Sequence, residues 1–247
     1  MIYFDSAGSY KILDEVIETI FKCNHNLYAN PSSSHLLGEA QVVQIEEARN
    51  LIADNLGCYP SEIIFTSGAT ESNNLALKQV LSEESKFHLI TTAVEHKCIL
   101  SIAHYIQSKG HSVTIVEPNS EGVISLEAIK RAIKPNTRLI SVMHVNNELG
   151  TINPIHDIGK YCFDSGILFH TDAAQSFGKL PIDVDQMNLD MVSVSAHKIG
   201  GPKGVGALYI RDLRSSSITP IIHGAGQEFG LRGGTLPTPL ISGFKQA

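Results

Sequence analysis

A lysine, a histidine and a serine directly follow a short apolar segment in the last quarter of the chain. Residues 191–194 read Met-Val-Ser-Val, which predicts a buried strand, and Ser195, His197 and Lys198 come next. The carboxyl ends of the strands in an open α/β sheet form the ligand-binding crevice. A lysine there can form a Schiff base with a carbonyl cofactor, of which pyridoxal 5'-phosphate (PLP) is the commonest. Taken alone, this segment is explained equally well by a solvated loop lysine.

A second candidate for chemistry is a turn of small residues. Residues 67–71 read Ser-Gly-Ala-Thr-Glu and follow an expected strand at 62–66. Free backbone N–H groups and the positive end of the helix dipole at such a turn suit a phosphate. A plain helix cap by Ser67 or Thr70, with Glu71 complementing the dipole, is an equally good interpretation of this turn by itself.

Three further polar groups also follow expected strands. Asp172, after residues 166–170, could pair with a protonated pyridine nitrogen or could cap the next segment. Residues 144–150 place two amides and a carboxylate after another strand. His96 opens a helix and could present its ring to a planar ligand, or could be a core histidine. Because all these groups are expected at carboxyl strand ends, together they favour a cofactor site.

Strands and helices alternate along the chain. The expected strands are 62–66, 88–92, 112–116, 138–143, 166–170, 191–194 and 205–210. The expected helices are 13–22, 36–56, 70–81, 96–109, 125–133 and 155–163. This alternation predicts an α/β fold with a mainly parallel seven-stranded sheet and helices on both faces.

The composition excludes several classes of protein. The chain has 247 residues, of which 43% are hydrophobic and 18% charged, and its net charge is -6. That charge argues against direct nucleic-acid binding, and no apolar run approaches the roughly eighteen residues that span a bilayer. No signal peptide is evident, so we expect a cytoplasmic location. Four cysteines without zinc-type spacing predict neither disulfides nor a metal site, and we interpret them as structural: Cys23, Cys58, Cys98 and Cys162.

With these residues in view, the chain resembles the cysteine desulfurases of the NifS/IscS type, in the class V aminotransferase group of fold-type I PLP enzymes. The segments that carry the resemblance follow the family's order over nearly the whole chain. They are 30–35 (N-P-S-S-S-H) with Gly38, 65–74 (F-T-S-G-A-T-E-S-N-N), 95–97, 144–150, 170–175 (H-T-D-A-A-Q), 193–204 and 232–237 (R-G-G-T-L-P).

The resemblance implies roles for individual side chains. Lys198 would bind PLP as a Schiff base and move the α-proton of the substrate, and Asp172 would pair with the ring nitrogen. Gln175 would bond the ring hydroxyl. His96 would stack on the ring and act with Lys198 in catalysis, and Asn147 would lie beside the substrate carboxylate. The phosphate would be held by Ala69, Thr70, Ser195, His197 and, from the other subunit of a homodimer, Thr235.

The implied reaction converts L-cysteine to L-alanine and passes sulfur to an acceptor protein as a persulfide, as in iron–sulfur cluster assembly. The family's loop cysteine and substrate-binding arginine would lie beyond residue 247. Residues 5–10 read D-S-A-G-S-Y where the family usually has D-N-A-A-T-T. We therefore expect an N-terminal segment (1–13) at the small-domain and subunit contact, a PLP-binding large domain (14–247), and no C-terminal small domain.

Two other functions fit the same residues. One is a different class V aminotransferase or lyase that needs no loop cysteine. The other is a non-catalytic relative that dimerises and serves as a scaffold for sulfur transfer. A Rossmann-type dinucleotide site is disfavoured, because no G-x-G-x-x-G follows the first strand.

Overall fold

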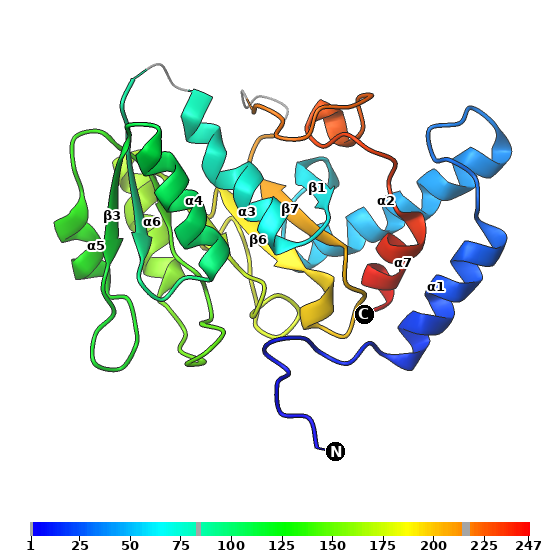
Figure 1. Cartoon of the computed structure of the whole chain (residues 1–247), viewed down its shortest axis with the longest axis horizontal. Coiled ribbons are helices and arrows are strands. Elements are labelled where there is room, and N and C mark those ends of the chain that lie inside the picture. Colours follow the sequence, from blue (N-terminus) through cyan, green and yellow to red (C-terminus); the bar gives the residue numbers. More distant parts are fainter. Residues whose placement is uncertain (1, 83–84, 214–217) are drawn as a thin grey trace.

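A seven-stranded sheet crosses the centre of the protein in the computed structural model, which describes residues 2–82, 85–213 and 218–247 (Figure 1). Its spatial order is β1-β7-β6-β5-β4-β2-β3, and among these strands only β7 runs against the others. The mainly parallel sheet is therefore confirmed. The strands are β1 (Ile63–Thr66), β2 (His88–Thr92), β3 (Ser112–Val116), β4 (Thr137–Ser141), β5 (Leu168–Asp172), β6 (Met191–Ser195) and β7 (Gly206–Ile210).

Helices cover both faces of this sheet, as expected. They are α1 (Asp14–Asn26), α2 (Leu36–Leu56), α3 (Ala69–Lys78), α4 (Lys97–Ser108), α5 (Leu126–Ala132), α6 (Ile155–Ser165) and α7 (Thr238–Gln246). Short 3-10 turns are η1 (Pro60–Glu62), η2 (Gln79–Ser82), η3 (Ala196–Lys198) and η4 (Glu228–Gly230). Helices α3 and α4 share one hydrophobic core with the sheet, while α2, α5 and α6 share the other.

The two cores follow from the period of a strand. Successive side chains point to opposite faces, so Leu89 of β2 enters the core under α3 and α4 while Ile90 enters the other. Leu139 and Ile140 of β4 divide in the same way. Because both faces are buried, two neighbouring positions of each of these strands are apolar, instead of apolar and polar residues alternating.

The β5 strand begins two residues later than expected. Gly166 has a left-handed backbone (φ 64°) and closes α6, so the strand starts at Leu168 and not at residue 166. As a result, Asp172 is itself the last residue of β5, instead of lying beyond its end.

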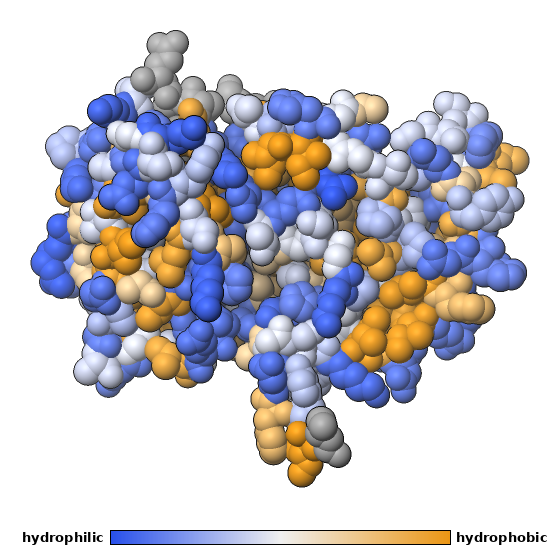
Figure 2. Space-filling view, in the orientation of Figure 1, coloured by the Kyte–Doolittle hydropathy of each residue, from blue (hydrophilic) through white to orange (hydrophobic). Residues whose placement is uncertain are grey.

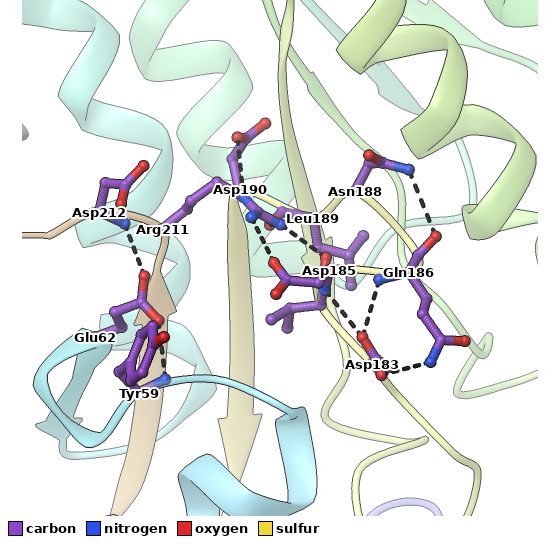
Figure 3. Close-up of polar contacts among 11 residues, drawn as sticks. Tyr59, Glu62, Asp183, Asp185, Gln186, Asn188, Leu189, Asp190, Arg211 and Asp212 are labelled. Atoms are coloured by element: carbon purple, nitrogen blue, oxygen red, sulfur yellow. Dashed lines mark hydrogen bonds and ion pairs between the residues drawn. The ribbon is translucent and has the colours of Figure 1, made fainter.

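A polar cluster braces the amino ends of the parallel strands (Figure 3). Arg211, just after β7, donates to the carboxylate of Asp185 at 2.6 Å and to the backbone oxygen of Leu189. Glu62 accepts the backbone N–H of Asp212 at 2.9 Å. These contacts tie the turn before β6 to the end of β7, opposite the carboxyl edge.

Helix α1 packs against α7 and leaves apolar side chains uncovered. Ile17 and Phe21 of α1 are exposed, and Figure 2 shows apolar surface over this part of the molecule. In the described ranges, no helix has both the length and the apolar character needed to cross a bilayer.

Candidate active site

The described residues enclose a pocket of about 340 Å³ at the carboxyl ends of the central strands. Its walls come from the ends of β5 and β6, the first turn of α3, the start of α4 and the loop after β4. This volume is typical of small-ligand pockets. Nine of the ten residues expected to bind a cofactor line it: Ala69, Thr70, His96, Asn147, Asp172, Gln175, Ser195, His197 and Lys198.

Lys198 extends into this pocket from η3, the turn after β6. Its Nζ donates to the backbone oxygens of Ala7 and Gly8 at 2.5 and 2.8 Å. Burial lowers the pKa of this amine below its ordinary value, although the Asp172 carboxylate acts in the opposite direction. A lowered pKa makes the amine neutral, and therefore nucleophilic, in a larger fraction of molecules. Lys198 is thus part of the pocket wall and not a solvated loop lysine.

Asp172 is buried at the end of β5 and is held by two donors. Its Oδ1 accepts the backbone N–H of Ala174 at 2.9 Å, and its Oδ2 accepts Nδ2 of Asn73 at 2.7 Å. Asn73, which is fully buried on α3, was not among the site residues expected from the sequence. Its spacing of four residues from Ala69 was a usable signal, because it places both on one face of the helix.

The first turn of α3 is open at its amino end. Gly68 occupies the N-cap position and no side chain caps the helix, so a cap by Ser67 or Thr70 is wrong. Instead, the carboxylate of Glu71 accepts the backbone N–H of Ser67 and pairs with Arg232 at 2.9 Å. Burial raises the pKa of Glu71, but these two partners outweigh it and the net shift is downward. Uncapped N–H groups beside a pocket suit an anion.

Two expected residues contact the N-terminal segment. Gln175 donates from Nε2 to the backbone oxygen of Ala7 at 2.7 Å. The Nδ1 atom of His197 lies 3.4 Å from the Ser9 hydroxyl. Residues 7–9 therefore lie along the pocket and satisfy side chains that were expected to bind the cofactor.

His96 precedes α4 and caps it with its ring. Its Nδ1 accepts the backbone N–H of Cys98 at 3.2 Å and lies 2.9 Å from the Cys98 sulfur. The side chain is exposed and lines the pocket, so the core-histidine alternative is wrong. Cys98, which was interpreted from the sequence as a structural cysteine, lines the pocket as well.

The loop that presents Asn147 is fixed by its neighbour. Asn146 is buried, donates to the Val94 backbone oxygen at 2.7 Å and accepts the backbone N–H groups of Glu148 and Leu149. Nearby, the buried Glu95 accepts the backbone N–H of Met143 at 2.8 Å.

Thr235 does not line the pocket. It is exposed on the segment before α7. The structure therefore brings together the nine residues expected from one copy of the chain, while Thr235, expected from a second copy, stays a prediction.

The residues of the pocket fit PLP. Uncapped N–H groups and hydroxyls at the α3 end suit its phosphate, and the buried carboxylate of Asp172 suits its ring nitrogen. The amine of Lys198, with its lowered pKa, suits its aldehyde.

A family model and several curated proteins match this chain over essentially its whole length. The family model described as aminotransferase class-V matches residues 2–247. A mitochondrial cysteine desulfurase of Candida maltosa is 48% identical over 249 residues, which is 100% of this chain and 51% of that protein. A mitosomal cysteine desulfurase of Trachipleistophora hominis is 48% identical, over 100% of this chain and 57% of the relative. The chain thus spans about half the length of these curated relatives.

Solved structures give the same match at the level of the fold. The structure titled "SspA in complex with cysteine" is 53% identical with a TM-score of 0.97, covering 100% of this chain and 72% of that one. A NifS-like protein is 41% identical with a TM-score of 0.95, covering 99% of this chain and 68% of its own.

These relatives correct the expected location. The prediction of a cytoplasmic protein is wrong, because the desulfurases of Candida maltosa and Candida albicans are mitochondrial and that of Trachipleistophora hominis is mitosomal. The prediction depended on the absence of a targeting signal, which is uninformative in a chain that spans about half of its relatives.

Proposed function

The chain belongs to the class V aminotransferase family, and from that premise we propose that it is the PLP-binding part of a cysteine desulfurase. It would act on L-cysteine, release L-alanine and pass sulfur to an acceptor protein, working as a homodimer. Within it, residues 14–247 would form the large domain and residues 1–13 the subunit-contact segment. The observation that supports this best is the gathering of nine expected residues around one pocket.

The residues of this pocket would bind three parts of PLP: its phosphate, its ring and its aldehyde. The first turn of α3, with Ser195 and His197, would bind the phosphate, and Thr235 of a second copy would join them. Asp172 and Gln175 would bond the ring nitrogen and the ring hydroxyl, and His96 would lie against the ring. Lys198 would bind the aldehyde. When bound, PLP would supply an electron sink for the α-carbon of the substrate.

Lys198, acting with His96, would move the proton of the substrate α-carbon. The lowered pKa of Lys198 favours a neutral amine that can take a proton from the substrate α-carbon at Nζ. To do so, the amine must leave the backbone oxygens of Ala7 and Gly8 that it contacts in this structure. Asn147 lies on the same pocket and would orient the substrate carboxylate.

None of the four cysteines is placed to act as a mobile sulfur acceptor. Cys23 and Cys162 are buried, and burial raises the pKa of Cys58 and of Cys162 to about 12 in each case. Cys98 lines the pocket, but it lies in the first turn of α4 and its sulfur is held between Asn73 and His96. We propose that the acceptor thiol is supplied from outside these residues.

Reduction with borohydride in the presence of PLP tests the proposal. The chain should turn yellow with PLP, and reduction should fix the cofactor on Lys198, as located by peptide mass. Lys198→Ala should lose this label, whereas Lys203→Ala, a lysine on the same pocket, should keep it. A chain that stays colourless with added PLP would count against every PLP-dependent reading.

The products distinguish a desulfurase from another class V enzyme. With L-cysteine and a thiol acceptor, the holoprotein should form alanine and sulfide or persulfide. Keto-acid formation without sulfur release would indicate an aminotransferase instead. If the chain binds PLP but forms neither product, the result would favour the non-catalytic scaffold.

A further inference from the structure

A continuous hydrogen-bond network joins two side chains of the proposed cofactor site. The Cys98 sulfur lies 2.9 Å from Nδ1 of His96 and 3.3 Å from Nδ2 of Asn73. The same Asn73 nitrogen donates to Oδ2 of Asp172 at 2.7 Å. The network therefore runs from the imidazole of His96, through the thiol of Cys98 and the amide of Asn73, to the carboxylate of Asp172.

The two groups at the ends of this network, a carboxylate and an imidazole, determine the direction of each hydrogen bond in it. A carboxylate only accepts, so the Asn73 nitrogen must face Asp172, and the sulfur of Cys98 accepts from that nitrogen. Nδ1 of His96 accepts the backbone N–H of Cys98, so the neutral ring carries its hydrogen on Nε2. The thiol hydrogen of Cys98 then points at the same Nδ1 lone pair, as a second donor beside that backbone N–H.

Asn73 provides an independent sign that this orientation is enforced. Its side-chain oxygen is buried and has no hydrogen-bond partner among the described residues. Rotating the amide would move that oxygen, but it would place two acceptors face to face at Asp172. Burial also raises the pKa of Cys98, with Asp172 adding to the effect, so the group keeps the hydrogen that it donates.

We propose that Cys98 is a positioning residue that fixes the His96 ring relative to Asp172, through Asn73. The role rests on the proposed function, since His96 and Asp172 are the side chains assigned there to the face and the nitrogen of the PLP ring. The Cys98 thiol adds a second donor at Nδ1 beside its own backbone N–H, so it strengthens the preference for the Nε2–H tautomer. Through Asn73 it also fixes the position of the His96 ring relative to Asp172.

Nitrogen NMR of the cofactor-free chain tests the link directly. With 15N-labelled histidine, His96 should carry its proton on Nε2, and Cys98→Ala should raise the fraction protonated on Nδ1 about fivefold, the worth of one net hydrogen bond. Cys98→Ser, which keeps a donor, should restore most of the original signal. Cys58→Ala removes another half-buried thiol, away from the pocket, and should change nothing at His96.

The result that overturns the link is an unchanged pair of His96 nitrogen signals in Cys98→Ala. Should the alanine variant not fold, Cys98→Val fills the space without a donor and gives the same reading.

PLP titration then tests the positioning role. The apparent affinity for PLP should fall about fivefold in Cys98→Ala, recover in Cys98→Ser and stay constant in Cys58→Ala. Equal affinities for the original chain and Cys98→Ala overturn the role, although the proposed function would stand. If the original chain binds no PLP, the proposed function fails, and the nitrogen signals still decide whether the link exists.

Discussion

The amine of Lys198 is under two opposing influences. Burial lowers its pKa, and the negative charges of Asp172 and, more weakly, Asp5 raise it. The sequence placed Lys198 after a strand, but this balance depends on neighbours that are 26 and 193 residues away.

Removing the Asp172 charge should therefore shift Lys198 in a defined direction. In Asp172→Asn the raising influence is lost, so the pKa of Lys198 falls further and the amine becomes neutral at lower pH. Labelling by a small aliphatic aldehyde and borohydride, followed by peptide mass across a pH series, should reach half its maximum at lower pH than in the original chain. Asp5→Asn should shift the profile the same way but less, and a shift to higher pH would contradict the assignment.

The buried carboxyl group of Glu95 couples pH to folding. Burial raises its pKa from an ordinary value of 4.5 to about 8, so the native state keeps a proton that the unfolded chain loses. Between these two values the native state binds more protons, and the free energy of unfolding falls as pH rises, by roughly 1.4 kcal/mol per pH unit. Below about 4.5 this contribution is fully present, and above about 8 it is lost.

Glu95→Gln should remove that loss. Urea unfolding between pH 5 and pH 9 should show a shallower decline for the variant than for the original chain, because glutamine stays neutral throughout. Parallel declines for the two proteins would mean that Glu95 is ionised in the native state.

At the scale of elements, the hydrophobic period predicted most of the fold. Strands buried on both faces have few alternatives, so the seven expected strands lie within about two residues of the observed ones. The boundary of β5 was wrong because Gly166 acts as a helix terminator, which periodicity alone does not register. Asn73 and Cys98 were missed because an asparagine or a cysteine in a helix acquires a role only through its tertiary partners.

The strands also set the width of the anion site. Gly206 begins β7 and pairs with Thr66 of β1 and Ser195 of β6, the strand ends on either side of the open α3 turn. A Cβ atom at Gly206 would lie 2.5 Å from the Val194 oxygen and 2.7 Å from the Gly68 Cα. Both partners are backbone, so they cannot move aside without displacing the turn.

Gly206→Ala should therefore weaken both folding and PLP binding. We expect a loss of about 1–3 kcal/mol in the free energy of unfolding, as for other overpacked cores, together with reduced affinity for PLP. Gly110→Ala is the matched control, because its Cβ atom meets nothing within 4 Å and only its positive φ is unfavourable. Urea unfolding and PLP titration measure the two effects, and equal PLP affinities in both variants would contradict a steric limit at the turn.

At the scale of the whole molecule, the site depends on segments that meet only in the folded chain. The N-terminal segment lies along η3, where Tyr10 and Leu13 donate their backbone N–H groups to His197 and Gly200 at 3.0 Å. Its carbonyl groups at Ala7 and Gly8 meet Lys198. No side-chain pattern could have predicted these contacts, because backbone oxygens are common to every residue.

A buried ion pair joins α2 to the segment that carries Thr235. The Arg49 guanidinium donates to both carboxylate oxygens of Glu228 at 2.9 and 2.8 Å, and the backbone N–H of Phe65 on β1 donates to the same carboxylate at 2.6 Å. Glu228 and Phe229 both have positive φ angles, 47° and 58°, which a non-glycine residue adopts only when held. The pair is therefore positioned to fix this turn against the sheet.

Glu228→Gln tests that role, because it leaves the Arg49 charge buried without its main counter-charge. Removing one partner of a buried pair costs about 3–5 kcal/mol, and urea unfolding should show a loss of this size. Glu127→Gln breaks an exposed pair with Lys130 and should have little effect. Replacing both partners, as in Arg49→Met with Glu228→Gln, should be less costly than the sum of the single changes, since no charge is then stranded. If the single and double variants lose stability additively, the two side chains act separately, and the turn before Thr235 is held by other contacts.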